Sequence, residues 1–147
     1  MKYLLAPISW IYAFFVWLRN VLYDDHVLPS HTVNVPTIAI GNLAVGGTGK
    51  TPMTEYIIRL LSSQYKVAVL SRGYGRKTRG FRLATLPDTA STIGDEPMQI
   101  HMHFPDIPVA VCADRVYGIK RLQMLYPNLQ CVILDDAYQH RKLRAGF

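Results

Sequence analysis

The sequence predicts an α/β fold in which a mostly parallel sheet is covered by helices on both faces and is preceded by a hydrophobic N-terminal helix. From residue 36 onward, short and nearly continuous apolar runs alternate with helix-like segments, as in sheets buried on both faces. The first of these runs leads into a glycine-rich loop, and the last ends in two acidic residues, Asp135 and Asp136. A chain of 147 residues is long enough to form one domain with a core.

The N-terminal segment is unusually apolar. Residues 3–18 carry no charge and are dense in aromatic side chains, a composition typical of a membrane interface. The run is shorter than the ~20 residues that span a bilayer core. We therefore expect residues 1–23 to form a membrane-associating helix that either lies in the interface or spans it. A helix packed in the core of its own domain and a cleaved signal peptide remain alternatives, although no small-residue cleavage site follows the run.

Residues 24–35 are expected to be a linker, and residues 36–147 the core domain. Within the core, the pattern predicts strands at 36–41, 66–71, 81–84, 107–112 and 129–134, and helices at 50–63, 95–103 and 114–126. Residues 85–93 are expected to be a loop. The helix at 95–103 is marked by Gly94-Asp95-Glu96-Pro97, because proline and acidic residues favour the first turn of a helix.

The glycine-rich loop predicts a phosphate-binding site. It consists of Gly46, Gly47, Thr48 and Gly49, followed by Lys50 and Thr51. Between a strand and a helix, such a loop directs backbone N–H groups at phosphate oxygens, the lysine reaches the β- and γ-phosphates, and the threonine hydroxyl binds Mg²⁺. Ala44 stands where the strict pattern has glycine. The alternative is an ordinary glycine-rich turn.

Acidic residues supply a second signal. Asp135 and Asp136 follow four apolar residues, as in a Walker B strand, where the carboxylate holds Mg²⁺ directly or through water. The predicted metal set is therefore Thr51, Asp135 and Asp136. Asp95 and Glu96 stand at a helix start, where a carboxylate can orient a hydroxyl and accept its proton. The alternative is that Asp95 only caps the helix.

The formal net charge of +6 indicates an anionic partner such as a nucleotide, a nucleic acid or an anionic lipid. Cations gather in the loop 72–82, which either clamps phosphate groups, docks on a membrane or is simply solvated; they are Arg72, Arg76, Lys77, Arg79 and Arg82. Ahead of the strand predicted at 81–84, Tyr74 is the one aromatic side chain interleaved with these cations, so we expect no nucleic-acid partner.

Three further residues follow predicted strands, and each has a structural alternative. Arg115 is either a phosphate contact or a surface residue. Gln139 and His140 either reach the nucleotide-binding cleft or are simply exposed to solvent where the chain leaves the last strand. Two cysteines in apolar runs, Cys112 and Cys131, are expected to be buried and reduced. They are too few for a four-cysteine zinc site.

Taken in order, these motifs resemble the tetraacyldisaccharide 4′-kinase family, the lipid A 4′-kinases of Gram-negative bacteria. The resemblance covers nearly the whole chain and rests on the hydrophobic N-terminus, residues 41–43 with 46–52, Leu70 to Arg76, Gly94 to Pro97, Asp114-Arg115 and Leu134 to Arg141. The family tolerates residues other than glycine at position 44. Ala137-Tyr138 stands where Gly-Phe is more usual.

The resemblance implies transfer of the ATP γ-phosphate to the 4′-hydroxyl of a tetraacyl disaccharide 1-phosphate, at the cytoplasmic face of the inner membrane. It also implies site roles: Asp95 as base, Arg115 as charge stabiliser, Lys50 and Thr51 on phosphate and Mg²⁺, Asp135 and Asp136 on the metal, and Arg72, Arg76, Glu96, Gln139 and His140 in the cleft. Family members are more than twice this length, with a second lobe that supplies a histidine to assist the base. The 147 residues alone are therefore expected to bind nucleotide weakly and to be impaired or inactive.

Two other function classes remain open. One is a P-loop ATPase or GTPase of another class; several of these carry a lysine early in the loop, where this chain has Val45. The other is a membrane-anchored nucleotide-binding module without kinase activity. For that module, Asp95→Ala would leave function unchanged, whereas for the kinase it lowers kcat and leaves ATP binding in place.

Overall fold

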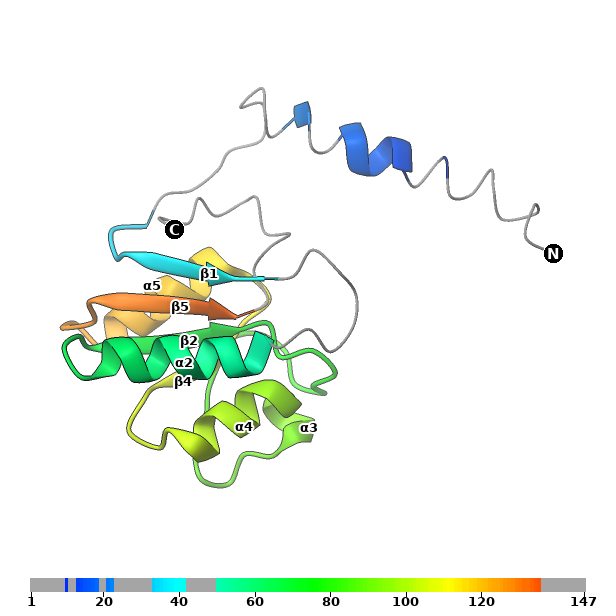
Figure 1. Ribbon diagram of the computed structural model, residues 1–147. Coiled ribbons are helices and arrows are strands. Elements are labelled where there is room, and N and C mark those ends of the chain that lie inside the picture. The colour runs from blue at the N-terminus through cyan, green and yellow to red at the C-terminus, as the bar shows by residue number, and fades with distance from the viewer. Residues whose placement is uncertain (1–9, 11–12, 19–20, 23–32, 42–49, 136–147) are drawn as a thin grey trace.

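The computed structural model describes residues 10, 13–18, 21–22, 33–41 and 50–135 (Figure 1). Its strands are β1 (Thr37–Ile40), β2 (Val67–Ser71), β3 (Arg82–Leu83), β4 (Val109–Val111) and β5 (Cys131–Asp135). Its core helices are α2 (Lys50–Ser62), α3 (Ala90–Ile93), α4 (Asp95–His103) and α5 (Arg115–Leu125). Each expected strand and helix of this part of the chain is present, and no end differs from the expected one by more than two residues.

The strands of the described chain form one sheet in the order β1-β5-β2-β4-β3. The first four run parallel, and β3 pairs antiparallel with β4 at one edge. Ile40 lies beside Asp135, and Leu70 lies beside Leu134. The carboxyl ends of β1, β5 and β2 therefore meet at one edge of the sheet, and the prediction of a mostly parallel sheet is confirmed.

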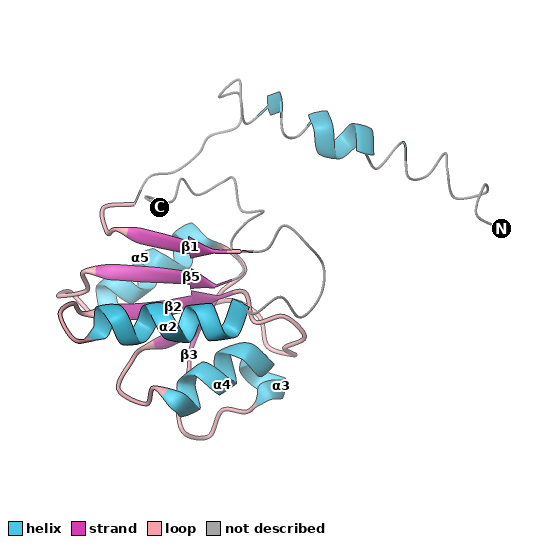
Figure 2. Cartoon of the chain, in the orientation of Figure 1, coloured by secondary structure: helices cyan, strands magenta, loops and turns pink. Residues whose placement is uncertain are grey.

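Helices cover both faces of the sheet, as predicted (Figure 2). On one face, Val69 and Ile133 pack with Ile58 of α2 and Ile100 of α4. On the other, Leu70 and Leu134 pack with α5 through the side chains Ile119 and Leu122. This alternation along β2 and β5 follows from the two-residue period of a strand.

Both cysteines are free and buried, as expected. Burial raises the pKa of the Cys112 thiol and of the Cys131 thiol. Because the thiolate is the reactive form, both side chains are inert packing groups.

Residues 85–93, which the sequence predicts as a loop, contain the short helix α3. Asp88 organises this segment by accepting hydrogen bonds from Thr85, from Thr92 and from Arg82. The Thr89 N–H donates to Thr92 Oγ1 at 2.9 Å and supports the first turn. Polar side chains rather than an apolar period hold α3 together, so hydrophobic patterning gives no sign of it.

The described part of the N-terminal segment is helical at residues 13–18. Phe14, Phe15 and Trp17 are exposed there, and the Phe14 ring lies against the rings of the other two. Whether this segment associates with a membrane or packs in its own domain stays a prediction. Within the described residues, none of the helices has the length and apolar character needed to cross a membrane. The boundaries at residues 23 and 35 stay predictions.

Candidate functional site

Asp135 lies at the carboxyl edge of the sheet, where β5 ends, and is 3% exposed. Its Oδ1 accepts a hydrogen bond from Thr54 Oγ1 at 3.2 Å, and its Oδ2 accepts one from Ser71 Oγ at 3.3 Å. Thr54 is in the second turn of α2, and Ser71 is the last residue of β2. The carboxylate is thus held between the start of α2 and the ends of two neighbouring strands.

The start of α2 supplies the phosphate-binding half of the candidate site. Lys50 and Thr51 are its first two residues. The backbone N–H groups of a helix N-terminus and the helix dipole favour an anion at this point. Gly46, Gly47, Thr48 and Gly49 lie outside the described residues, as does the side chain of Lys50, so their contacts with phosphate stay predictions.

Arg115 is the first residue of α5 and is 2% exposed, so the alternative of a surface residue is wrong. Its Nη1 donates to the carbonyl oxygen of Cys112 at 2.9 Å, and its Nη2 donates to that of Asp135 at 3.0 Å. The guanidinium therefore joins the chain just after β4 to the end of β5. Its predicted role in stabilising phosphate charge is untested.

A contact between glycines brings two sequence motifs together. Gly73 has φ 70° and Gly94 has φ 98°, a region that favours glycine. A Cβ on Gly94 would lie 3.0 Å from the Tyr74 carbonyl oxygen and 3.1 Å from Gly73 Cα. The loop after β2 and the start of α4 can approach this closely only because both residues lack side chains.

Gly94 is also the N-cap of α4, so the alternative that Asp95 caps this helix is wrong. Asp95 and Glu96 instead occupy its first turn, and the Asp95 side chain is exposed. An exposed carboxylate at this position remains available to a substrate hydroxyl. Whether Asp95 and Glu96 act on a substrate stays a prediction.

The basic loop after β2 is folded rather than loosely solvated. The Lys77 N–H donates to the Ser91 carbonyl oxygen at 2.8 Å. Arg76 donates to the Gly80 carbonyl oxygen at 2.7 Å, and burial lowers the pKa of its guanidinium. Arg82 forms a 2.6 Å ion pair with Asp88 and therefore has a structural role within the loop.

A hollow of about 490 Å³ lies within this loop. Among the residues that line it are Arg72, Arg76, Arg79 and Tyr74. Guanidinium groups around such a space suit an oxyanion, because each presents several N–H donors. The loop therefore remains a candidate for contact with phosphate or with an acidic lipid group.

The residues available for a metal are oxygen donors. Asp135 and Thr51 supply a carboxylate and a hydroxyl, the ligand types that Mg²⁺ prefers. Among residues 33–41 and 50–135, no three His, Cys, Asp or Glu side chains gather as a metal site. Asp136, the third member of the predicted set, lies outside the described residues, as do Gln139 and His140.

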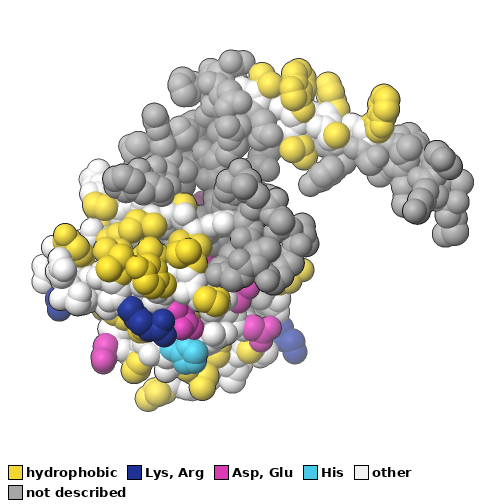
Figure 3. Space-filling view, in the orientation of Figure 1, with side chains coloured by type: hydrophobic (Ala, Val, Ile, Leu, Met, Phe, Trp, Pro, Cys, Tyr) yellow, Lys and Arg dark blue, Asp and Glu magenta, His cyan; other side chains and the backbone are white. Residues whose placement is uncertain are grey.

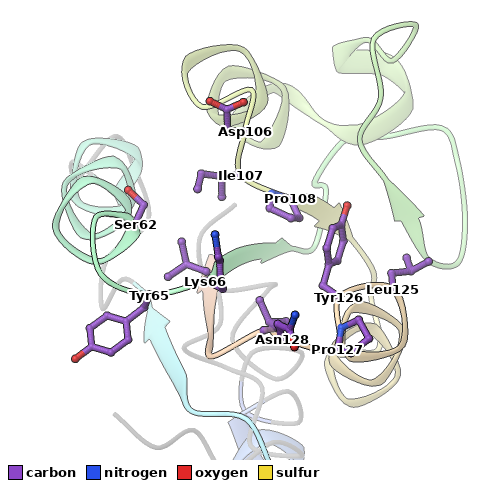
Figure 4. Close-up of a pocket in the computed structure, with 12 residues that line it drawn as sticks. Ser62, Tyr65, Lys66, Asp106, Ile107, Pro108, Leu125, Tyr126, Pro127 and Asn128 are labelled. Atoms are coloured by element: carbon purple, nitrogen blue, oxygen red, sulfur yellow. The ribbon is translucent and has the colours of Figure 1, made fainter.

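A second hollow, of about 470 Å³, lies at the opposite end of the parallel strands, where β2, β4 and β5 begin (Figure 4). Lys66, Asp106, Tyr126 and Asn128 are among its lining residues, and none of the predicted site residues is there. Ligands of open parallel sheets bind at the carboxyl ends of the strands. We therefore place the candidate site around Asp135 and the start of α2.

Comparison with known proteins identifies the family. The family model described as tetraacyldisaccharide-1-P 4′-kinase matches residues 1–147. The chain belongs to this family. A tetraacyldisaccharide 4′-kinase of Flavobacterium psychrophilum is 52% identical over 143 residues, which are 97% of this chain and 42% of the relative. One of Bacteroides fragilis is 56% identical over 143 residues, which are 97% of this chain and 38% of the relative.

A solved structure of a family member agrees with the fold. The crystal structure of LpxK from Aquifex aeolicus, an "apo" form in complex with ATP, superposes with a TM-score of 0.86 and 37% sequence identity. The match covers 96% of this chain and 45% of that one. The chain thus spans about two fifths of the length of the curated relatives it matches.

Proposed function

We propose that these residues form the nucleotide-binding part of a tetraacyldisaccharide 4′-kinase. In this proposal the γ-phosphoryl group of ATP passes to the 4′-hydroxyl of a tetraacyl disaccharide 1-phosphate. The observation that carries it is the hydrogen bond from Thr54 to Asp135, which holds the acidic end of β5 against the helix that follows the glycine-rich loop. Membership of the kinase family and the likeness to a structure in complex with ATP support it.

The phosphate groups of ATP would lie at the start of α2. Backbone N–H groups of the loop 46–49 and the Lys50 ammonium would hold them. Thr51, Asp135 and Asp136 would hold Mg²⁺, which when bound neutralises charge on the β- and γ-phosphates. The buried carboxylate of Asp135, oriented by two hydroxyl donors, supports this assignment.

Asp95 would be the general base. Its carboxylate would accept the proton of the 4′-hydroxyl while the sugar oxygen bonds to the γ-phosphorus and the bond to the β-phosphate oxygen breaks, releasing ADP. Its exposed position at the start of α4 supports this role. The contact of Gly94 with Gly73 places the basic loop beside it.

The remaining roles concern the lipid and the membrane. Arg72 and Arg76 would bind phosphate or an acidic lipid group. Glu96, Gln139 and His140 would complete the cleft. Arg115 would stabilise the charge on the phosphate groups. The exposed Phe14, Phe15 and Trp17 support a membrane-surface location for a substrate with four acyl chains. The proposed location is the cytoplasmic face of the inner membrane.

The test is phosphate transfer from labelled ATP to a lipid A disaccharide precursor. The assay uses a polypeptide that carries these 147 residues within a chain of the relatives' full length. We expect transfer by the parent and a large loss of turnover rate for Asp95→Ala, about a hundredfold or more, since a positioned base contributes about 10²–10⁴-fold. ATP binding, measured by calorimetry, should stay within about twofold, because Asp95 acts on the acceptor hydroxyl.

Absence of transfer by the parent polypeptide would refute the kinase assignment. Transfer that Asp95→Ala leaves unchanged would refute the role of Asp95. Nucleotide binding without any transfer would favour the membrane-anchored binding module. The 147 residues alone are expected to bind ATP more weakly than the full-length polypeptide and to show little or no turnover.

A further inference from the structure

A buried carboxylate joins α2 to α4. Glu55 of α2 is 8% exposed. Its Oε1 lies 2.8 Å from His103 Nδ1 and accepts a hydrogen bond from Gln99 Nε2 at 3.1 Å, and both partners belong to α4. Its Oε2 forms a 2.9 Å ion pair with Arg59, one turn further along α2. Figure 3 shows acidic, basic and histidine side chains side by side where the two helices meet.

The spacing of these residues continues toward the candidate site. Gln99 and His103 are four residues apart, and Asp95 stands four residues before Gln99, so all three share one stripe of α4. On α2, Thr51 stands four residues before Glu55. Both helices begin at the carboxyl edge of the sheet (Figure 1). The stripe that Glu55 fixes is therefore the one that carries Asp95, one turn beyond the contact.

The donors around Glu55 favour its charged form. Burial raises the pKa of Glu55, but hydrogen bonds from His103, Arg59 and Gln99 outweigh burial and leave that pKa below its usual value. Hydrogen bonds to a charged group are stronger than those between neutral groups. Arg59 also lies over the Phe104 ring, 5.2 Å from its centroid, and Phe104 directly follows the last residue of α4.

We propose that Glu55 is a positioning residue, which holds α4 at one rotation and one height against α2 so that Asp95 faces the phosphate-binding start of α2. This inference rests on the proposed role of Asp95. A carboxylate about 5 Å from a helix axis moves by about 2 Å when the helix turns by about 20°, on the dimensions of an α-helix. A misplacement of about 1 Å can cost about 10²-fold in rate.

The kinetic test uses the full-length polypeptide described above. We expect Glu55→Ala to lower kcat by about 10- to 100-fold, while the KM for ATP changes by less than about threefold, because the phosphate loop is untouched. Glu55→Gln, which keeps the shape and an accepting oxygen, should stay within about threefold of the parent. The control is Ile119→Val, a mildly destabilising core truncation on the other face of the sheet.

A double-mutant cycle separates positioning from general loss of stability. His103→Ala should lower kcat by a smaller factor than Glu55→Ala and should lower it no further once Glu55 is absent, because residues in contact are coupled. A kcat for Glu55→Ala equal to that of the Ile119→Val control would overturn the inference. So would fully additive losses for Glu55→Ala and His103→Ala.

A second measurement does not depend on activity. Spin labels at Leu60→Cys on α2 and Met102→Cys on α4 report the distance between the helices; both positions are exposed, whereas Cys112 and Cys131 are buried. We expect a single narrow distance in the parent, a shifted or broadened one in Glu55→Ala, and the parent distance in Glu55→Gln. An unchanged distance in Glu55→Ala overturns the inference, even where the parent transfers no phosphate and the proposed function itself has failed.

Discussion

Asp88 offers a quantitative test of how the segment before α4 is held. Its carboxylate accepts from Arg82 Nε at 2.6 Å, from Thr92 Oγ1 at 2.7 Å, and from the backbone N–H and hydroxyl of Thr85, both at 2.9 Å. Burial alone would raise the pKa of Asp88, but these donors lower it from 3.8 to about 2. A difference of this size corresponds to about 2 kcal/mol of folding free energy.

The sign of the pH dependence follows from the lowered pKa. The unfolded chain binds a proton at Asp88 more readily than the folded chain, so this stabilisation is complete above about pH 5 and is lost as the pH falls toward 2. Asp88→Asn should therefore lower the free energy of unfolding by about 2 kcal/mol at pH 7. At pH 3 the difference between parent and variant should be roughly half as large.

Urea denaturation of parent and variant at pH 7, 5, 4 and 3, followed by circular dichroism, measures this difference directly. The exposed Asp106→Asn is a matched control, because it makes the same chemical change outside such a network. A loss for Asp88→Asn that stays constant from pH 7 to pH 3 would refute the linkage. A loss at pH 7 no greater than that of the control would refute the assigned strength of the network.

Three further substitutions test the candidate site. Gly94→Ala should lower the free energy of unfolding by about 2–3 kcal/mol, because φ 98° is strained for alanine and its Cβ would meet Gly73. Urea denaturation measures this loss, and a loss smaller than that of a substitution on the exposed surface would contradict the prediction. Arg115→Lys should lower the free energy of unfolding by about 1.5–3 kcal/mol, since the single nitrogen of lysine cannot occupy the positions of both Nη1 and Nη2. Equal thermal stability of variant and parent would argue against it. Thr54→Val should weaken Mg²⁺-dependent ATP binding by about 3- to 10-fold while metal-free binding is unchanged, because Asp135 loses a donor that orients it; calorimetry with and without Mg²⁺ decides, and equal weakening in both would point to a general defect.

The elements of the sheet and its helices were predictable because hydrophobic periodicity is a local signal. The run from Val67 to Ser71 and the run from Cys131 to Asp135 are buried throughout, and each is visible in the sequence as four apolar residues followed by a polar one. The helix α3 escapes such reasoning because short-range polar contacts at Asp88 determine it. The N-cap of α4 is ambiguous in the sequence, because either Gly94 or Asp95 could precede the first turn. The backbone angles of the folded chain make Gly94 the N-cap and place Asp95 in the first turn.

The parts of the site that could not be predicted depend on long-range pairing. Thr54 and Ser71 orient Asp135 across 81 and 64 residues of sequence. Nothing near either hydroxyl in the chain distinguishes it from a solvated side chain. Glu55 likewise looks like an ordinary surface acid on a helix until α4 packs beside it, 44 and 48 residues later. The motifs predicted which edge of the sheet matters, and the fold supplied the groups that hold it in place.

The pairing of β1 with β5 has a consequence for how the protein folds. Ile40 and Asp135 are neighbours in the sheet although about 95 residues separate them in the chain. Contacts of such long range form slowly, because a large loop must close before they form. At about 5–20 residues per second, a ribosome needs several seconds or more after β1 to complete β5. During that interval β1 has no partner on its β5 side, and the sheet is completed only after the growing chain has passed residue 135.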